Sequence, residues 1–256
     1  MLIQKAENGK YVLEIHLDED PLNPREEQDN LGTMVCWHNR YALGDKRSKG
    51  DPEDFIVALA EEMWQNAPVS HYAGLIEAVQ EILKEEEQEH LKDAEFWYPE
   101  SLIAELATEN PDKLQELVFQ DPNLVILPLN LYDHSGISMS TGRQYPFDCP
   151  WDSGQVGWIY LTKKRFLQET GHGSDQWPDK AEEILEAEVK EYNYFLTGQV
   201  FGFVLDKKTP CETCGTVELE TLDSCWGFAG DHCEEDIKGH LDPEFHYLLD
   251  ELEEVY

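Results

Sequence analysis

The segment Asn123–Tyr132, NLVILPLNLY, is apolar at successive positions and not only at alternate ones. A strand with one face in water alternates between apolar and polar residues, whereas a strand covered on both faces reads as a continuous apolar run. This segment therefore predicts an interior strand. Pro128 cannot donate a hydrogen bond to a neighbouring strand, so it also predicts a bulge or an edge position at that point.

Further β segments flank this strand on both sides. Four of them are predicted by short runs in which apolar and polar residues alternate or β-forming residues are frequent, with glycine-containing and polar turns between them. They are KYVLEIHL (10–17), TMVCWHNRYAL (33–43), ISMST (137–141) and QVGWIYLT (155–162). QVFGFVLD (199–206) and TVELETLD (216–223) predict a hairpin with the tip KKTPCETCG (207–215).

Helical signals begin at Asp51-Pro52-Glu53, which places an N-cap, a first-turn proline and an acid in order. A second apolar stripe runs from Leu75 to Leu83 and continues into the acidic segment KEEEQEHLKDAE (84–95). Helical spacing or Asp-Pro and Asn-Pro starts predict the remaining helices: Pro99–Ala107, Pro111–Phe119, Lys163–Thr170, Pro178–Gly198 and a short acidic one over Asp242–Val255.

The order of these elements is mixed and does not alternate as βαβ units do. We therefore expect an α+β fold with a central antiparallel or mixed sheet, several acidic amphipathic helices and a helical insertion near 52–120. No internal repeat and no Gly/Ser linker interrupts the chain, which predicts a single domain over 1–256, with 52–120 as a possible helical subdomain.

The composition restricts the classes of partner. The chain has 256 residues with 54 Asp and Glu against 19 Lys and Arg, a formal net charge of −35. Such a chain is not expected to bind DNA, RNA or an anionic membrane directly, and an electrostatically selected partner would be basic. No apolar run is long enough for a membrane span, and the first residues show no signal peptide, so we expect a cytoplasmic protein in the host cell.

Three interpretations of the charge remain open: a solvated acidic surface, mimicry of the DNA phosphate ladder, and cation binding. Duplex DNA carries one charge per ~1.7 Å, so a mimic needs carboxylates spread over an extended face. The acidic segments near 77–95, 179–191 and 242–254 are the candidates. The carboxylates expected to bind the partner are Glu85, Glu86, Glu87, Glu89, Glu182, Glu183, Glu186, Asp250, Glu251 and Glu253.

Chemically reactive residue types gather in YDHSGISMSTGRQYPFDCPWDSGQVGW (132–158). Cys149, His134 and Asp152 are the types needed for a thiol nucleophile, its base and an orienting acid, and Asp133 with His134 and Asp152 could hold a metal. The acidic surroundings of Cys149 oppose a reactive thiolate. The alternative is that these polar side chains stabilise tight turns or form a binding surface.

The cysteines near the C-terminus form a second pattern. Cys211-x-x-Cys214 has the spacing of half a zinc knuckle, and Cys225 and Cys233 could complete a four-thiolate site. The long gap between the last two weakens this zinc interpretation. Free or buried thiols and a redox pair are the alternatives.

Four blocks resemble a family of uncharacterised proteins encoded by phages and conjugative elements: DNLGTMVCWHNRYALGD (29–45), LPLNLYDHSGISMST (127–141), CPWDSGQVGWIYLT (149–162) and DSCWGFAGD (223–231). The resemblance implies a mobile-element origin and assigns no activity or catalytic residue. Together with the charge it favours an inhibitor of a basic host protein, such as a nuclease or another DNA-binding defence factor, that acts by DNA mimicry. A thiol- or metal-dependent enzyme using residues 133–152 and a zinc-stabilised interaction protein are the alternatives.

Overall fold

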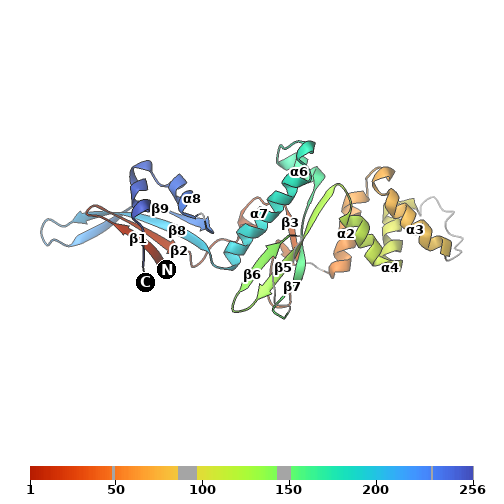
Figure 1. Ribbon diagram of the computed structural model, residues 1–256, viewed down its shortest axis with the longest axis horizontal. Helices are drawn as coiled ribbons and strands as arrows, with labels where there is room; N and C mark the ends of the chain where they lie inside the picture. Colours follow the sequence, from red (N-terminus) through yellow and green to blue (C-terminus); the bar gives the residue numbers. More distant parts are fainter. Residues whose placement is uncertain (48–49, 86–96, 143–150, 232, 256) are drawn as a thin grey trace.

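The apolar run at 123–132 forms β5 (Leu124–Asp133), an interior strand of a five-stranded sheet ordered β4-β3-β7-β5-β6. The computed structural model describes residues 1–47, 50–85, 97–142, 151–231 and 233–255 (Figure 1). The register of β5 against β7 shifts between Leu129 and Asn130, directly after Pro128. Both the interior position and the irregularity beside the proline are confirmed.

Both faces of β5 are covered, which explains its continuous apolar sequence. On one face Leu127 and Leu129 belong to a buried cluster with Leu185 and Val189 of the long helix α7 (Asp179–Leu196). On the other face Leu124 and Ile126 pack into a second cluster, made mainly by the helices of the insertion. The sheet therefore lies between α7 and the helical insertion (Figure 1).

The rest of this sheet is built from short strands. They are β3 (Thr33–Cys36), β4 (Lys46–Arg47), β6 (Ile137–Thr141) and β7 (Ser153–Thr162). The pairs are antiparallel except β3 with β4. The strand expected over 33–43 is wrong beyond Cys36, because the chain leaves the sheet there and turns back through His38.

The helical insertion agrees with its sequence signals. It contains α2 (Pro52–Trp64), η1 (Val69–His71), α3 (Ala73–Glu85), α4 (Pro99–Glu109) and α5 (Pro111–Phe119). Asp51 forms a capping box with Asp54 at the start of α2. The buried Trp64 indole donates to the Asp121 carboxylate at 2.8 Å, which ties α2 to the segment that enters β5.

A second sheet, ordered β10-β1-β2-β8-β9, is entirely antiparallel. Its strands are β1 (Leu2–Glu7), β2 (Tyr11–Leu17), β8 (Val200–Pro210), β9 (Val217–Ala229) and β10 (Glu253–Glu254). Helix α8 (Cys233–His240) and the 3₁₀ helix η5 (Pro243–Glu251) supply Ile237 and Leu248 to a third buried cluster, which contains Leu13 and Phe203. The expected hairpin of β8 and β9 is confirmed.

The expectation of a helix over the whole tail is wrong. Only Pro243–Glu251 is helical, and it is a 3₁₀ helix. Glu253 and Glu254 pair with Lys5 and Gln4 of β1, so the chain must become extended after Glu251. Pairing with a free sheet edge therefore overrides the local helical tendency.

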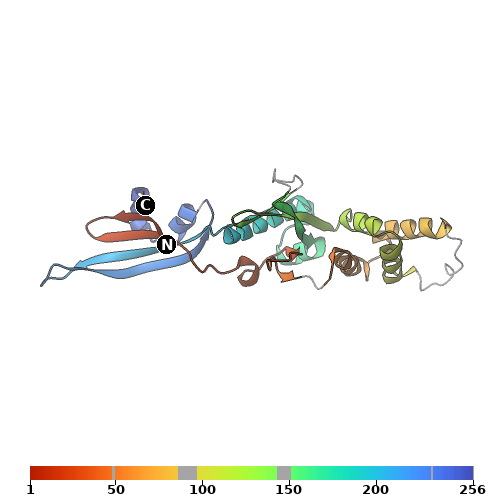
Figure 2. The same cartoon turned by 90° about the horizontal axis from the view of Figure 1, so that it is seen from below.

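The three clusters follow one another along an elongated molecule (Figures 1 and 2). Within the described ranges the other helices are α1 (Pro24–Glu27), α6 (Lys163–Glu169) and η4 (Ser174–Gln176). In the part of the chain that the structure describes, no helix is both long and apolar enough to cross a membrane. The fold is α+β, with one antiparallel sheet, one mainly antiparallel sheet and a helical insertion, as the order of elements predicts.

Candidate functional site

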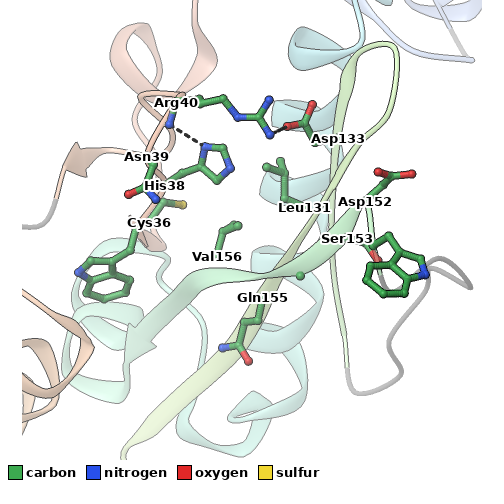
Figure 3. Close-up of a pocket in the computed structure, with 13 residues that line it drawn as sticks. Cys36, His38, Asn39, Arg40, Leu131, Asp133, Asp152, Ser153, Gln155 and Val156 are labelled. Carbon is green, nitrogen blue, oxygen red and sulfur yellow. Dashed lines mark hydrogen bonds and ion pairs between the residues drawn. The ribbon is translucent and has the colours of Figure 1, made fainter.

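A polar pocket of about 540 Å³ opens where β3 leaves the sheet (Figure 3). Its walls come from residues 36–40, from Leu131 and Asp133 of β5, and from residues 151–156 at the start of β7. Three of the four sequence blocks thus converge on one concave surface. The fourth block lies on β9 and in the residues after it, in the other sheet.

His38 occupies one side of this pocket because the backbone after β3 folds around it. The His38 Nδ1 atom accepts the backbone N–H groups of Arg40 at 3.3 Å and Tyr41 at 3.2 Å. The neutral ring therefore carries its proton on Nε2. The ring stacks on Tyr41 with centroids 4.9 Å apart and is directed into the pocket (Figure 3).

Asp133 closes another side through an ion pair. The Arg40 guanidinium lies 2.8 Å from Asp133 Oδ2, and the Tyr41 hydroxyl donates to Oδ1 at 3.1 Å. The Asp133 side chain is only 20% exposed, whereas that of Arg40 is 72% exposed. Arg40 therefore offers its remaining N–H donors to solvent or a ligand, and Asp133 is held mainly in a structural role.

His134 and Asp152 form the pair that the sequence suggested. His134 Nδ1 lies 3.1 Å from Asp152 Oδ2, and the backbone N–H of Asp133 donates to the Asp152 carbonyl at 2.7 Å. A carboxylate on Nδ1 leaves Nε2 of the imidazole available as a base or a ligand. The predicted nucleophile Cys149 lies outside the described residues.

Cys36, also part of the pocket wall, is not an alternative nucleophile. Burial raises the pKa of its thiol to about 12, and the nearby Asp45 carboxylate acts in the same direction. A thiol with this pKa is protonated at neutral pH. Sequence reasoning left His38 and Arg40 out of the site, because the motif VCWHNRY was expected to continue as a strand, whereas β3 ends at Cys36.

The predicted binding carboxylates are distributed over separate elements. On α7, Glu183 and Glu186 are exposed, Glu182 is half-buried, and Lys180 pairs with Glu183 at 2.7 Å. Asp250, Glu251 and Glu253 are exposed at the C-terminal end of the second sheet. Glu85 is the last helical residue of α3, and Glu86, Glu87 and Glu89 lie outside the described residues.

The four cysteines proposed as zinc ligands lie in two places. Cys211 and Cys214 are at the tip of the β8–β9 hairpin, whereas Cys225 and Cys233 pack against the third cluster. Cys225 follows Cys214 by eleven residues, nearly all in β9, which at the rise of a strand separates them by roughly 30 Å. Nowhere in the described ranges do three or more His, Cys, Asp or Glu side chains form a group able to hold a metal.

The two tip thiols differ in their surroundings. The Thr216 hydroxyl, followed by the Thr216 backbone and the Cys211 side chain, lowers the pKa of Cys214 to about 7. Cys214 is exposed, so its thiolate is accessible to reagents and to metals.

Comparison with known proteins adds no relative. No protein-family model, no curated protein and no solved structure matches the chain.

Proposed function

We propose that this protein is a non-enzymatic inhibitor of mobile-element origin that occupies a basic groove of a nucleic-acid-binding host protein. Exposed carboxylates would stand in for the phosphates of DNA. Partners of this type include nucleases and other DNA-binding defence factors.

The observation that carries the proposal is that several of the predicted carboxylates are exposed and lack an ion-pair partner among the described residues. Glu186, Asp250, Glu251 and Glu253 are exposed, and none of them has a cationic partner among the described residues. Uncompensated carboxylates on a surface attract a basic partner and accelerate its association. The net charge of −35 extends this attraction over the whole molecule.

The shape supports the same proposal. The molecule is elongated, with α7 near its middle and the C-terminal acids towards one end (Figure 1). A basic groove that binds duplex DNA follows the phosphates over an extended path. An elongated acidic ligand can contact such a groove at several separate points.

The test is salt-dependent capture followed by competition. The chain, immobilised on resin, is exposed at low salt to nuclease-treated bacterial lysate, and bound proteins are eluted with rising salt and identified. A captured nucleic-acid-binding protein is then titrated with a fluorescent DNA duplex in the presence of the free chain. We expect displacement of the duplex and a steep loss of affinity with salt.

Two variants with equal charge change sharpen this test. Glu186→Gln, Asp250→Asn and Glu251→Gln together remove three of the proposed carboxylates. Glu61→Gln, Glu100→Gln and Glu109→Gln remove three exposed acids from the helical insertion. Weaker displacement by the first variant alone supports the proposal. Equal effects, or affinity independent of salt, would overturn it.

A second function is favoured by one observation, the His134–Asp152 pair beside the polar pocket. The pair has the residue types of a base and its orienting acid in an enzyme. A covalent thiol probe that labels Cys149 selectively would favour this enzyme. Full biological activity in a Cys149→Ala, His134→Ala double variant would exclude the enzyme hypothesis.

A further inference from the structure

The tip of the β8–β9 hairpin holds two cysteines on one tight turn. The Cys211 N–H donates to the Thr216 carbonyl at 2.8 Å, and the Gly215 N–H donates to the Cys211 carbonyl at 2.9 Å. Gly215 has φ +73°, a backbone conformation that glycine adopts at little cost. The sequence Cys-x-x-Cys-Gly thus forms a single closed turn that brings Cys211 and Cys214 to the same end of the hairpin.

This turn presents sulfur ligands in a polar setting. The Cys214 sulfur lies 3.2 Å from the Thr216 hydroxyl oxygen, and Cys214 is exposed. Two cysteines separated by two residues supply half of the tetrahedral sulfur set that Zn²⁺ uses in structural sites. Hydrogen bonds to the sulfur from the following residues hold such ligands in place.

The chain does not complete the set from its own described residues. Cys225 is roughly 30 Å away along β9, and Cys233 lies in α8, after the far end of that strand. The described residues contain no third ligand-type side chain placed to join the tip pair. A structural zinc site is almost always four-coordinate. A four-coordinate zinc at this tip therefore needs two further ligands from outside the described residues.

The position of the tip allows a second copy to supply that pair. The pairing of β2 with β8 ends at Lys207, whereas the pairing of β8 with β9 continues to Pro210 and Val217. The last part of the hairpin is thus two-stranded and projects at one end of the long axis (Figures 1 and 2). In both views no other labelled helix or strand lies beside this end of the hairpin (Figures 1 and 2).

Charge also favours a tip-to-tip arrangement. Two chains of net charge −35 repel each other, but charges separated by more than about 8 Å are largely screened at physiological salt. Contact through the two tips keeps the acidic bodies apart, although Glu212 lies in the turn itself and Lys208 is already paired with Glu7. Side-by-side association would instead place the acidic surfaces against each other.

We propose that one Zn²⁺ joins two copies of this protein at their hairpin tips, bound by Cys211 and Cys214 of each copy. The four thiols bind as thiolates and release their protons to the solvent, with no change of oxidation state. The result is a metal-dependent dimer about twice as long as the single chain. This inference is independent of the proposed inhibitor function.

The experiment uses the full chain without a histidine tag, reduced and stripped of metal by a chelator. Zn²⁺ is titrated in while sedimentation velocity reports the mass and a metal-sensitive dye reports the metal bound. We expect a twofold increase in mass that saturates at one Zn²⁺ per two chains and is reversed by chelator. Co²⁺ in place of Zn²⁺ should give the intense absorption of a tetrahedral four-thiolate site.

Matched cysteine variants assign the ligands. Cys211→Ser and Cys214→Ser should each abolish the dimer and the Co²⁺ spectrum, with unchanged thermal unfolding because the tip is exposed. A Cys225→Ser, Cys233→Ser double variant should keep both signals. One Zn²⁺ per monomer, a dimer that survives Cys214→Ser, or the absence of Zn²⁺ binding would each overturn the proposal.

Discussion

Arg25 organises the segment between β2 and β3. Its guanidinium is 1% exposed and contacts Asp45 at 2.5 and 2.8 Å and Glu188 of α7 at 2.7 Å. A further N–H group donates to the Gly32 carbonyl at 2.8 Å. Glu188 also accepts the Leu31 N–H at 2.7 Å. The buried cation therefore ties the loop, the segment after β3 and α7 together.

Replacing Arg25 with Ala should lower the free energy of unfolding by about 3–5 kcal/mol, because Asp45 and Glu188 would lose their buried counter-charge. Arg40→Ala is the control, because the Arg40 side chain is 72% exposed, so its ion pair with Asp133 is open to solvent and should be worth less than about 1 kcal/mol. Urea unfolding followed by tryptophan fluorescence measures both. Similar losses in the two variants would contradict a special role for Arg25.

The thiol of Cys214 should respond to pH in a range where Cys36 does not. Its pKa is lowered to about 7, so the reactive thiolate becomes populated as the pH rises through 7. In the metal-free chain we expect the alkylation rate of Cys214 to rise with a midpoint near that value. Cys36, with a pKa raised to about 12, should remain unlabelled.

Thiol-specific labelling with peptide mass spectrometry gives these rates. Thr216→Val is the matched variant: it removes the hydroxyl group that contributes most to the lowered pKa, so the midpoint should move upward. A midpoint near that of an ordinary cysteine in the original chain would show that the turn does not stabilise the thiolate.

The pairing of β3 with β7 depends on a close backbone approach. A Cβ atom added at Gly157 would overlap the Val35 carbonyl oxygen and lie 2.9 Å from the Cys36 Cα atom. Because both obstacles are backbone, β3 could accommodate the methyl group only by moving away from β7. The approach also positions Trp37, whose backbone N–H donates to the Val156 carbonyl at 2.7 Å beside the pocket.

Gly157→Ala should therefore destabilise the protein by about 1–3 kcal/mol, the usual cost of overpacking. Gly154→Ala on the same strand is the control, because no atom lies within 4 Å of the added methyl group. Chemical denaturation compares the two variants. If Gly154→Ala costs as much as Gly157→Ala, the steric explanation is wrong.

The acidic composition acts on the molecule as a whole. The carboxylates behind the net charge of −35 repel one another in the compact state. The exposed ion pairs offset little of this repulsion. This repulsion is long-ranged at low salt, so it acts between the two sheets and the helical insertion as well as within each of them.

Added salt should therefore stabilise the fold. Raising NaCl from about 0.01 M to about 1 M shortens the screening length from about 30 Å to about 3 Å, and the free energy of unfolding should increase. Choline chloride is the control that separates screening from specific binding of Na⁺. A decrease with both salts would mean that local ion pairs dominate over the net charge.

Local signals were sufficient wherever an element depends on its own residues. The Pro-containing helix starts at 52, 99 and 111, the apolar run of β5 and the existence of the β8–β9 hairpin all follow from short stretches. The tip itself is shorter than the expected 207–215, because β8 continues to Pro210. Their determinants are capping, fixed proline φ angles and burial periodicity, which act between residues close in the chain.

Contacts between distant segments decided the rest. The end of the tail forms a strand because β1 offers a free edge. The Arg25 guanidinium can be buried because Asp45 and Glu188, from other parts of the chain, form ion pairs with it. The pocket joins residues 36–40 with 131–133 and 151–156, and the four cysteines are divided between two places. Short stretches carry no information about these juxtapositions, because they depend on how complete sheets and helices pack.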